Sequence, residues 1–270
     1  MNRSPSEAKC AVYTPLTAHS IGIFTELSLM RLGPFLFAAL LTGAATHVSA
    51  APSATCSTRL ADGRSFLTGG TTSAAPNANP IAIAHFFEND GSLKPAAPML
   101  AARAAHVCIA LQDSSILVAG GVSGPGGPTN SAEIYDPKTD NGGPTGAMLT
   151  ARTSAAAILL KDGRVLVSGG DYSGQIANTL EIYDPAENRF RVARDVLSSA
   201  RAGHAIALLN DGRILIAGGT DGGRVLNTID IFDPATEAIR PAGFMTSPRS
   251  DFTATTLAGW PRSLRRWFRR

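Results

Sequence analysis

Four arginines recur along this 270-residue chain, each shortly before an apolar stretch. They are Arg103, Arg152, Arg201 and Arg249. Arginine binds carboxylate and sulfate groups through paired hydrogen bonds, so a ring of such residues could form a cationic rim that holds an anionic ligand. The alternative, which we favour, is that the four guanidinium groups are structural and are satisfied by carboxylates or carbonyls of the repeats.

Histidine, tyrosine and acidic side chains are the other candidates for chemistry. His106 and His204 occupy the same position in two repeats, but the third repeat has Ala155 there, which favours a packing role. Tyr135 and Tyr183 also share one position and are expected in the core. The remaining candidates are His85, Tyr172 and the loop acids Asp140, Asp171 and Asp221. The sequence has neither zinc-ligand spacing nor a nucleophile-elbow or Walker motif.

Three cysteines are present, of which Cys10 lies near the N-terminus. Cys56 and Cys108 each precede a turn, but their distances along the chain to Leu60 and Leu111 differ by one residue. Because successive side chains of a strand point to opposite faces, these two cysteines should point in opposite directions in neighbouring repeats. We therefore predict that they form no disulfide.

An internal repeat accounts for these recurrences. Residues 160–170 read LKDGRVLVSGG and residues 209–219 read LNDGRILIAGG, with looser copies at 60–70 and 111–121. The second glycines of the four pairs lie about 50 residues apart. Asp-Gly between apolar runs predicts a two-residue hairpin turn in which both residues have positive φ. The apolar run is typical of a buried strand, and the glycine pair indicates a bend or a close backbone approach.

Two further elements follow in each unit. One is a strand that ends at Asp-Pro, as in EIYDP at 133–137 and 181–185 and DIFDP at 230–234. The other is a short segment that closes the unit with arginine, as in residues 148–152. A fourth short strand lies between them, for example at 188–192. Each unit thus supplies about four antiparallel strands, which predicts one blade of a β-propeller.

This pattern resembles the Kelch family, in particular the bacterial form that is similar to the central domain of galactose oxidase. The glycine pair, the aromatic residue before Asp-Pro and the repeating arginine carry the resemblance, which covers about residues 51–257. The family's usual tryptophan near the fourth strand is missing, with Phe190 and Ile239 nearest to its place. The copper site of galactose oxidase, built from two histidines, two tyrosines and a cysteine, has no matching pattern here.

The expected organisation places blades between two segments of other kinds. Residues 30–50 read as a signal peptide that is cleaved before Ala51, and residues 1–29 form a doubtful N-terminal extension that precedes a second start at Met30. The alternative is an apolar N-terminal helix that stays attached. The blades are expected at about 51–103, 104–152, 153–201 and 202–249, with the start of a further blade at 250–258.

The last residues, 259–270, depart from the repeat and are rich in arginine and tryptophan. A shift of one nucleotide from Gly259 onward, for arginine codons CGN and a serine codon TCN, permits Asp-Gly-Arg-Val-Leu and forces two glycines that the repeat requires. We therefore interpret the segment as out of frame, which makes the ring incomplete. The alternative is a natural basic tail that binds membrane or nucleic acid.

Charge and family resemblance together set the functional expectation. The formal net charge is +3, but the basic excess lies in the two end segments, and acidic residues outnumber basic ones between Ala51 and Ala258. This distribution argues against a nucleic-acid partner. We expect a secreted or periplasmic, non-catalytic propeller without metal or cofactor that binds a protein or glycan and does not span the membrane. The alternatives are a fragment of a galactose oxidase-like enzyme or sugar epimerase, or a truncated propeller without function.

Overall fold

The computed structural model describes residues 55–73, 78–124 and 127–256. The expected N-terminal extension at 1–29, the signal peptide at 30–50 and the segment at 259–270 lie outside the described residues, as does Cys10. The described residues form an all-β structure, as the sequence predicted.

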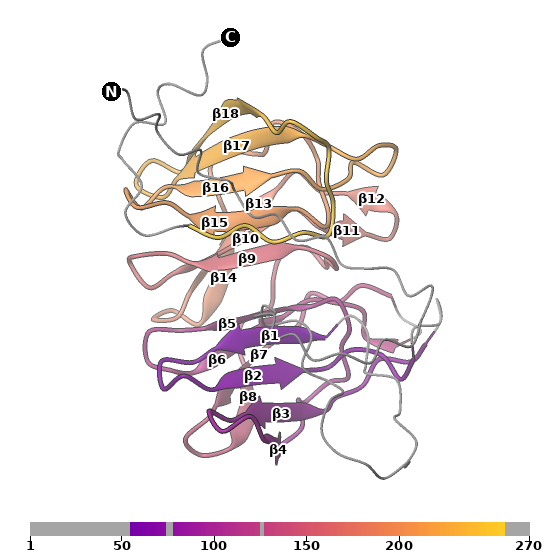
Figure 1. Ribbon diagram of the computed structural model, residues 1–270, viewed down its shortest axis with the longest axis vertical. Helices are drawn as coiled ribbons and strands as arrows, with labels where there is room; N and C mark the ends of the chain where they lie inside the picture. Colours follow the sequence, from indigo (N-terminus) through magenta and orange to yellow (C-terminus); the bar gives the residue numbers. More distant parts are fainter. Residues whose placement is uncertain (1–54, 74–77, 125–126, 257–270) are drawn as a thin grey trace, which may run out of the picture.

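Four four-stranded antiparallel sheets make up the fold, and we call them blades 1 to 4 in chain order (Figure 1). Blade 1 contains β1 (Cys56–Arg59), β2 (Ser65–Thr68), β3 (Ala84–Phe87) and β4 (Leu93–Ala96). Blade 2 contains β5 (Val107–Ala110), β6 (Ile116–Ala119), β7 (Ala132–Asp136) and β8 (Asn141–Pro144). Blade 3 contains β9 (Ala156–Leu159), β10 (Val165–Ser168), β13 (Leu180–Asp184) and β14 (Arg189–Val192). Blade 4 contains β15 (Ala205–Leu208), β16 (Ile214–Ala217), β17 (Thr228–Asp233) and β18 (Ala238–Phe244).

Blade 3 carries an additional hairpin between its second and third principal strands. This hairpin consists of β11 (Asp171–Tyr172) and β12 (Gln175–Ile176), and it projects from one side of the stack in Figure 1. The first strands of the blades are neighbours at each junction, because β1 lies against β5, β5 against β9 and β9 against β15. Blades 1 and 4 lie at opposite ends of the molecule, so the described blades form an open stack rather than a closed ring (Figure 1).

The hydrophobic core lies between the blades. Phe66 of blade 1 packs with Ile116 and Val118 of blade 2, whereas Leu117 of blade 2 packs with Val165 of blade 3. Phe66 and Leu117 occupy equivalent positions in their blades, and Ile116 is equivalent to Val165. Alternate side chains of one strand therefore enter different cores, which is why the apolar run of each blade is continuous rather than alternating.

The turn after the first strand differs from the expected two-residue turn. The amide of Gly63 donates to the carbonyl of Leu60 at 3.1 Å, and the amide of Leu60 donates to the carbonyl of Arg64 at 2.8 Å. Gly63 has a φ of 91°, whereas Asp62 does not have positive φ. The loop therefore has three residues and ends in a left-handed glycine, a common alternative hairpin. The expectation of positive φ at Asp62 was wrong because this aspartate instead accepts the Arg64 amide at 3.0 Å.

The glycine pairs mark both a bend and a close approach. In blade 3, Gly169 and Gly170 have φ values of 58° and 100°. A Cβ on Gly169 would lie 2.2 Å from the carbonyl oxygen of Arg201, which belongs to the next repeat. The Gly170 amide donates to that same carbonyl at 2.9 Å. A Cβ on Gly170 would lie 2.8 Å from the carbonyl oxygen of Thr153, so neither glycine leaves room for a side chain. The glycines therefore position the segment that carries the recurring arginine.

Candidate functional site

The recurring arginines lie at the junctions between blades and are buried. The exposed fractions of Arg103, Arg152 and Arg201 are 2%, 1% and 0%. Each forms an ion pair with an acid on the third principal strand of the blade that follows it. The pairs are Arg103 Nε with Glu133 Oε1 at 3.0 Å, Arg152 Nη2 with Glu181 Oε1 at 2.7 Å, and Arg201 Nη2 with Asp230 Oδ2 at 3.0 Å.

Backbone carbonyls and hydroxyls accept further guanidinium hydrogens, although the buried Nε of Arg152 has no hydrogen-bond partner among the described residues. Arg152 Nη1 donates to the carbonyls of Gly169 at 2.7 Å and Thr179 at 3.1 Å. Its Nη2 also donates to the Thr179 hydroxyl at 3.1 Å. The acid also binds the connecting segment, because Glu181 accepts a hydrogen bond from the amide of Leu149 at 2.7 Å. Arginine and acid together fix the glycine bend, the third strand and the connecting segment of one repeat.

These contacts give Arg103, Arg152 and Arg201 a structural role, and the three side chains do not form a cationic rim. Their hydrogen bonds point into the junction, and their burial keeps them from a ligand at the described surface. Burial lowers the pKa of Arg201, an effect that the charge of Asp230 and its hydrogen bond oppose. Arg249 is different, since it is only half-buried and has no ion pair among the described residues.

The acids Glu133, Glu181 and Asp230 were not singled out from the sequence, although a signal was present. They recur at the first position of the EIYDP and DIFDP segments, directly before an isoleucine. A buried carboxylate requires a cationic or hydrogen-bonding partner, and the recurring arginine has the same period. The shared period of acid and arginine could have identified the pair.

The two histidines at equivalent positions bind hydroxyl groups of the preceding blade. The Nε2 atom of His106 lies 2.8 Å from Thr68 Oγ1, and that of His204 lies 2.6 Å from Ser168 Oγ. The Nδ1 atoms of both histidines have no hydrogen-bond partner among the described residues. Burial, with a contribution from the nearby arginine, lowers the pKa of each histidine to about 3. Both side chains are therefore neutral at physiological pH and act as hydrogen-bonded packing groups.

The tyrosines and loop acids also serve local structure. The Tyr135 hydroxyl donates to the carboxylate of Asp140, and the Tyr183 hydroxyl lies 2.7 Å from the hydroxyl of Thr145. Burial raises the pKa of both tyrosines. Asp171 accepts the amide of Gly174 at 2.7 Å within its hairpin turn.

The two remaining candidates, Asp221 and His85, also lie apart from the other candidate residues. Asp221 accepts the amide of Arg224 at 2.9 Å. His85 is half-buried on β3, at the position that an acid occupies in the other blades. The candidates do not converge: the described part of the chain contains no group of three or more histidine, cysteine or acidic residues arranged to hold a metal ion.

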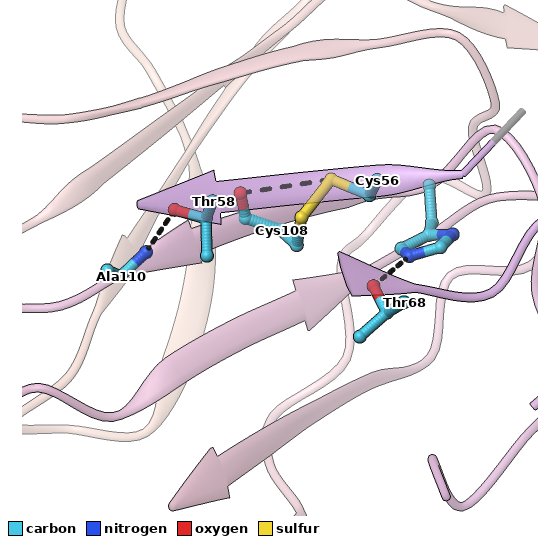
Figure 2. Close-up of a disulfide and its surroundings, with 6 residues drawn as sticks. Cys56, Thr58, Thr68, Cys108 and Ala110 are labelled. Carbon is cyan, nitrogen blue, oxygen red and sulfur yellow. Dashed lines mark hydrogen bonds between the residues drawn. A yellow bond between two sulfur atoms is a disulfide. The ribbon is translucent and has the colours of Figure 1, made fainter. Parts of the chain in front are cut away.

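Cys56 and Cys108 form a disulfide that joins blade 1 to blade 2, so the prediction that they do not pair was wrong (Figure 2). Their registers are indeed out of phase, because Cys56 is opposite Thr68 whereas Cys108 is opposite Val118. Side chains of opposite phase point to opposite faces, but the faces that meet at a blade junction are the opposite faces of neighbouring blades. Figure 2 shows the two sulfur atoms bonded between β1 and β5, where Thr58 Oγ1 also accepts the Ala110 amide at 3.2 Å.

The Kelch motif matches this chain at residues 103–141, 152–196 and 200–238. These segments lie in blades 2, 3 and 4 with their preceding arginines. The chain thus contains Kelch repeats, and its fold is that of a Kelch-type β-propeller with four described blades.

Two solved structures are similar to this chain. The chain is similar to YjhT, with a TM-score of 0.62 and 14% sequence identity, over 75% of this chain and 68% of that one. A fungal alcohol oxidase of the AA5 family in complex with copper is matched with a TM-score of 0.49 and 18% identity, over 73% of this chain and 54% of the oxidase. At this identity the likeness to YjhT concerns the fold alone. No curated protein matches the sequence significantly.

Within the described residues, no helix has the length and apolar character needed to cross a bilayer.

Proposed function

We propose that this protein is an exported Kelch propeller that binds a protein or glycan partner and catalyses no reaction. The observation that carries the proposal is the contrast between a repeated framework and unlike loops. The arginine–acid pairs recur in blades 2 to 4, the glycine bends in all four blades, and a hydrogen-bonded tyrosine in blades 2 and 3. Kelch propellers offer such a framework for presenting loops, and loops carried on a rigid scaffold are common binding sites.

The loops after the glycine pairs differ between blades. Blade 3 inserts the β11–β12 hairpin, on which Tyr172 is 47% exposed. Blade 4 instead has a short turn in which Asp221 accepts the amides of Gly223 and Arg224, followed by the exposed Val225. An exposed tyrosine combines an apolar ring with a hydroxyl group, which suits contacts with both proteins and sugars. We place the binding surface on these loops.

Export is supported by the disulfide between Cys56 and Cys108. Structural disulfides persist in oxidising compartments and are rare in the reducing cytosol. Fractionation of the producing cells, with N-terminal sequencing of the purified protein, tests this part. A mature N-terminus at Ala51 in the periplasmic or secreted fraction is expected, whereas a reduced cytosolic form would contradict export.

Binding is tested with the purified mature chain on arrays of glycans and of extracellular proteins from the same cells. Tyr172→Ala should lower the affinity for the captured ligand about tenfold or more, as is common for an aromatic residue at the centre of an interface. Val192→Ala is the matched control, because Val192 is equally exposed, at 47%, but lies on the outer strand β14. Equal effects of the two substitutions on affinity would show that the loops are not part of the binding surface.

The absence of catalysis is tested on the same preparation. Copper content after incubation with copper salts, and hydrogen peroxide formation with a panel of sugars and alcohols, should both stay at background. Peroxide formation that depends on bound copper would overturn the non-catalytic role and favour the oxidase alternative.

A further inference from the structure

The chain segment after blade 4 reproduces the junction that each blade makes with the next. The Gly219 amide of blade 4 donates to the carbonyl of Arg249 at 2.8 Å, and the Arg249 amide donates to Leu226 at 3.0 Å. The first of these bonds has three counterparts: Gly70 to Arg103 at 2.8 Å, Gly121 to Arg152 at 2.9 Å, and Gly170 to Arg201 at 2.9 Å. Residues 245–256 therefore lie on blade 4 as the start of each blade lies on its predecessor.

The backbone two residues further on continues the same series. The amide of Asp251 donates to Gly203 at 2.7 Å, that of Gly203 to Ser154 at 3.0 Å, and that of Ser154 to Ala105 at 3.0 Å. All four residues have positive φ, with 52° at Ala105, 53° at Ser154, 60° at Gly203 and 53° at Asp251. Asp251 adopts this unfavourable conformation because it occupies the fourth position of a continuous hydrogen-bonded series whose other three members lie at the starts of blades 2, 3 and 4.

The side chain that follows, Phe252, also fits the position that it occupies in the junction. Phe252 occupies the position of the junction histidines, and a Cβ on Gly218 would lie 2.8 Å from its Cε1 atom. Where a second strand ends in a hydroxyl residue, the following blade supplies histidine, and where it ends in alanine, the following blade supplies an apolar residue. The pairs are Thr68 with His106, Ala119 with Ala155, Ser168 with His204, and Ala217 with Phe252.

Two features of this junction are incomplete. Leu215 of blade 4 is only partly buried, whereas the equivalent Leu117 and Leu166 are completely buried by the next blade. Arg249 has no acidic partner among the described residues, whereas the three earlier arginines each have one. What the junction lacks is therefore an apolar second strand and an acid on a third strand.

The free face of blade 1 is a poor match for the open face of blade 4. At the positions where blade 2 presents Ile116, Cys108 and Ala110, blade 1 presents polar residues. These are Ser65, Ser57 and Arg59. A second copy that stacked its blade 1 on blade 4 would place a guanidinium group and two hydroxyls where the other junctions are apolar, so the complementarity favours a further blade of the repeating type.

We propose that the open face of blade 4, formed by Leu215 and by the segment 249–256 that covers the buried Ala217, is the docking site of a fifth Kelch blade. The continuation of this chain supplies that blade, in the frame that a one-nucleotide shift at Gly259 restores. Its second strand covers Leu215, and an acid at the start of its third strand pairs with Arg249. The inference concerns assembly of the propeller and is independent of the proposed ligand binding.

The first test is sequencing of genomic DNA and transcript across codons 255–270 and several hundred bases downstream. The expected result is a frame that reads Asp-Gly-Arg-Val-Leu and then an aromatic–Asp-Pro strand with an acid at its start. A confirmed stop after Arg270, with no repeat in any downstream frame, would overturn the assignment of the blade to this chain.

The second test measures the docking itself. A full chain in which residues 259–270 are replaced by a copy of its own residues 162–193 carries a fifth blade of known type. We expect a melting midpoint about 5 °C or more above that of the original chain, since repeat stability depends on neighbouring interfaces. Hydrogen exchange in β15 and β16 should slow at least about tenfold. An unchanged midpoint and unchanged exchange in a folded extended chain would overturn the proposal.

A substitution separates docking from a general effect of length. Arg249→Gln should lower the midpoint of the extended chain clearly but that of the original chain little, because only the former offers an acid. Arg201→Gln should destabilise both chains, since Asp230 is already present. An equal response of both chains to Arg249→Gln would contradict the proposed pairing. Light scattering on the original chain completes the test: a dimer in which β15 and β16 are protected would assign the face to a second copy instead.

Discussion

Arg152 and Glu181 form an ion pair at 2.7 Å with no exposed surface on either side chain. The arginine lies in the connection before blade 3, and the glutamate lies on β13 of that blade. A buried pair of this kind is costly to break, because the remaining partner is left charged in a medium that solvates it poorly. The pair therefore controls the geometry of the junction rather than simply adding attraction between two charges.

Substitution of Arg152 by methionine should accordingly destabilise the protein by about 3–5 kcal/mol. The double substitution Arg152→Met with Glu181→Leu should recover a substantial part of this loss, because no charge is then buried alone. Denaturant unfolding of the two variants measures the difference. Arg189→Met is the control, since Arg189 pairs with Glu187 at the surface and should change the free energy of unfolding by less than about 0.5 kcal/mol. A double variant no more stable than Arg152→Met would show that the arginine's packing, not the charge balance, is what matters.

The disulfide leads to a prediction about reduction. Cys56 and Cys108 are separated by 52 residues in the sequence, so cross-linking them restricts the unfolded chain considerably. Loop-closure entropy for such a separation corresponds to about 4 kcal/mol of stabilisation. Treatment with reductant should lower the unfolding midpoint, and blade 1 should lose hydrogen-exchange protection first. Cys56→Ala with Cys108→Ala should be insensitive to reductant; a shift of similar size in that variant would locate the effect elsewhere.

The buried histidines make stability depend on pH. Their pKa is about 3 in the folded protein, mainly because of burial, and about 6.5 in the unfolded chain, so protonation favours unfolding. This contribution to stability is complete above pH 6.5 and decreases as the pH falls toward 3. At pH 5 each histidine should cost about 2 kcal/mol relative to neutral pH. His204→Ala introduces the residue type that blade 3 has at the equivalent position, Ala155. This variant should be less stable than the parent protein at pH 7 but should lose stability less steeply between pH 7 and 5. Parallel slopes for variant and parent would rule out His204 as the titrating group.

Much of the framework could be predicted from the sequence because its signals are local. The Asp-Gly turns, the apolar runs and the glycine pairs define strands and blades without any knowledge of long-range contacts. The disulfide could not be predicted in the same way, because the phase of Cys56 and Cys108 within their strands was correct but its consequence depended on which faces meet. The role of Arg103, Arg152 and Arg201 likewise depended on burial, which a repeating position alone does not reveal. Sequence periodicity identifies equivalent residues, whereas the stacking of blades decides what they contact.

The glycine bends permit a final prediction, in which the cost of a steric clash is separated from the cost of an unfavourable backbone conformation. Gly169 and Gly174 both have positive φ, at 58° and 86°, but only Gly169 is crowded, since a Cβ there would lie 2.2 Å from the Arg201 carbonyl oxygen. Gly174 lies in the β11–β12 turn with no atom within 4 Å of such a Cβ. Gly174→Ala should therefore cost only the conformational penalty of about 1 kcal/mol.

Gly169→Ala should cost clearly more, about 3 kcal/mol, because the methyl group forces apart the backbones of blade 3 and the Arg201 segment and weakens the Gly170–Arg201 hydrogen bond. Urea unfolding of both variants measures the two penalties. Hydrogen exchange of β15 should rise in Gly169→Ala and stay unchanged in Gly174→Ala, since only the former lies at the junction with blade 4. Equal penalties for the two substitutions would mean that the junction can widen at no cost, and that the glycine pairs are required for their backbone conformation alone.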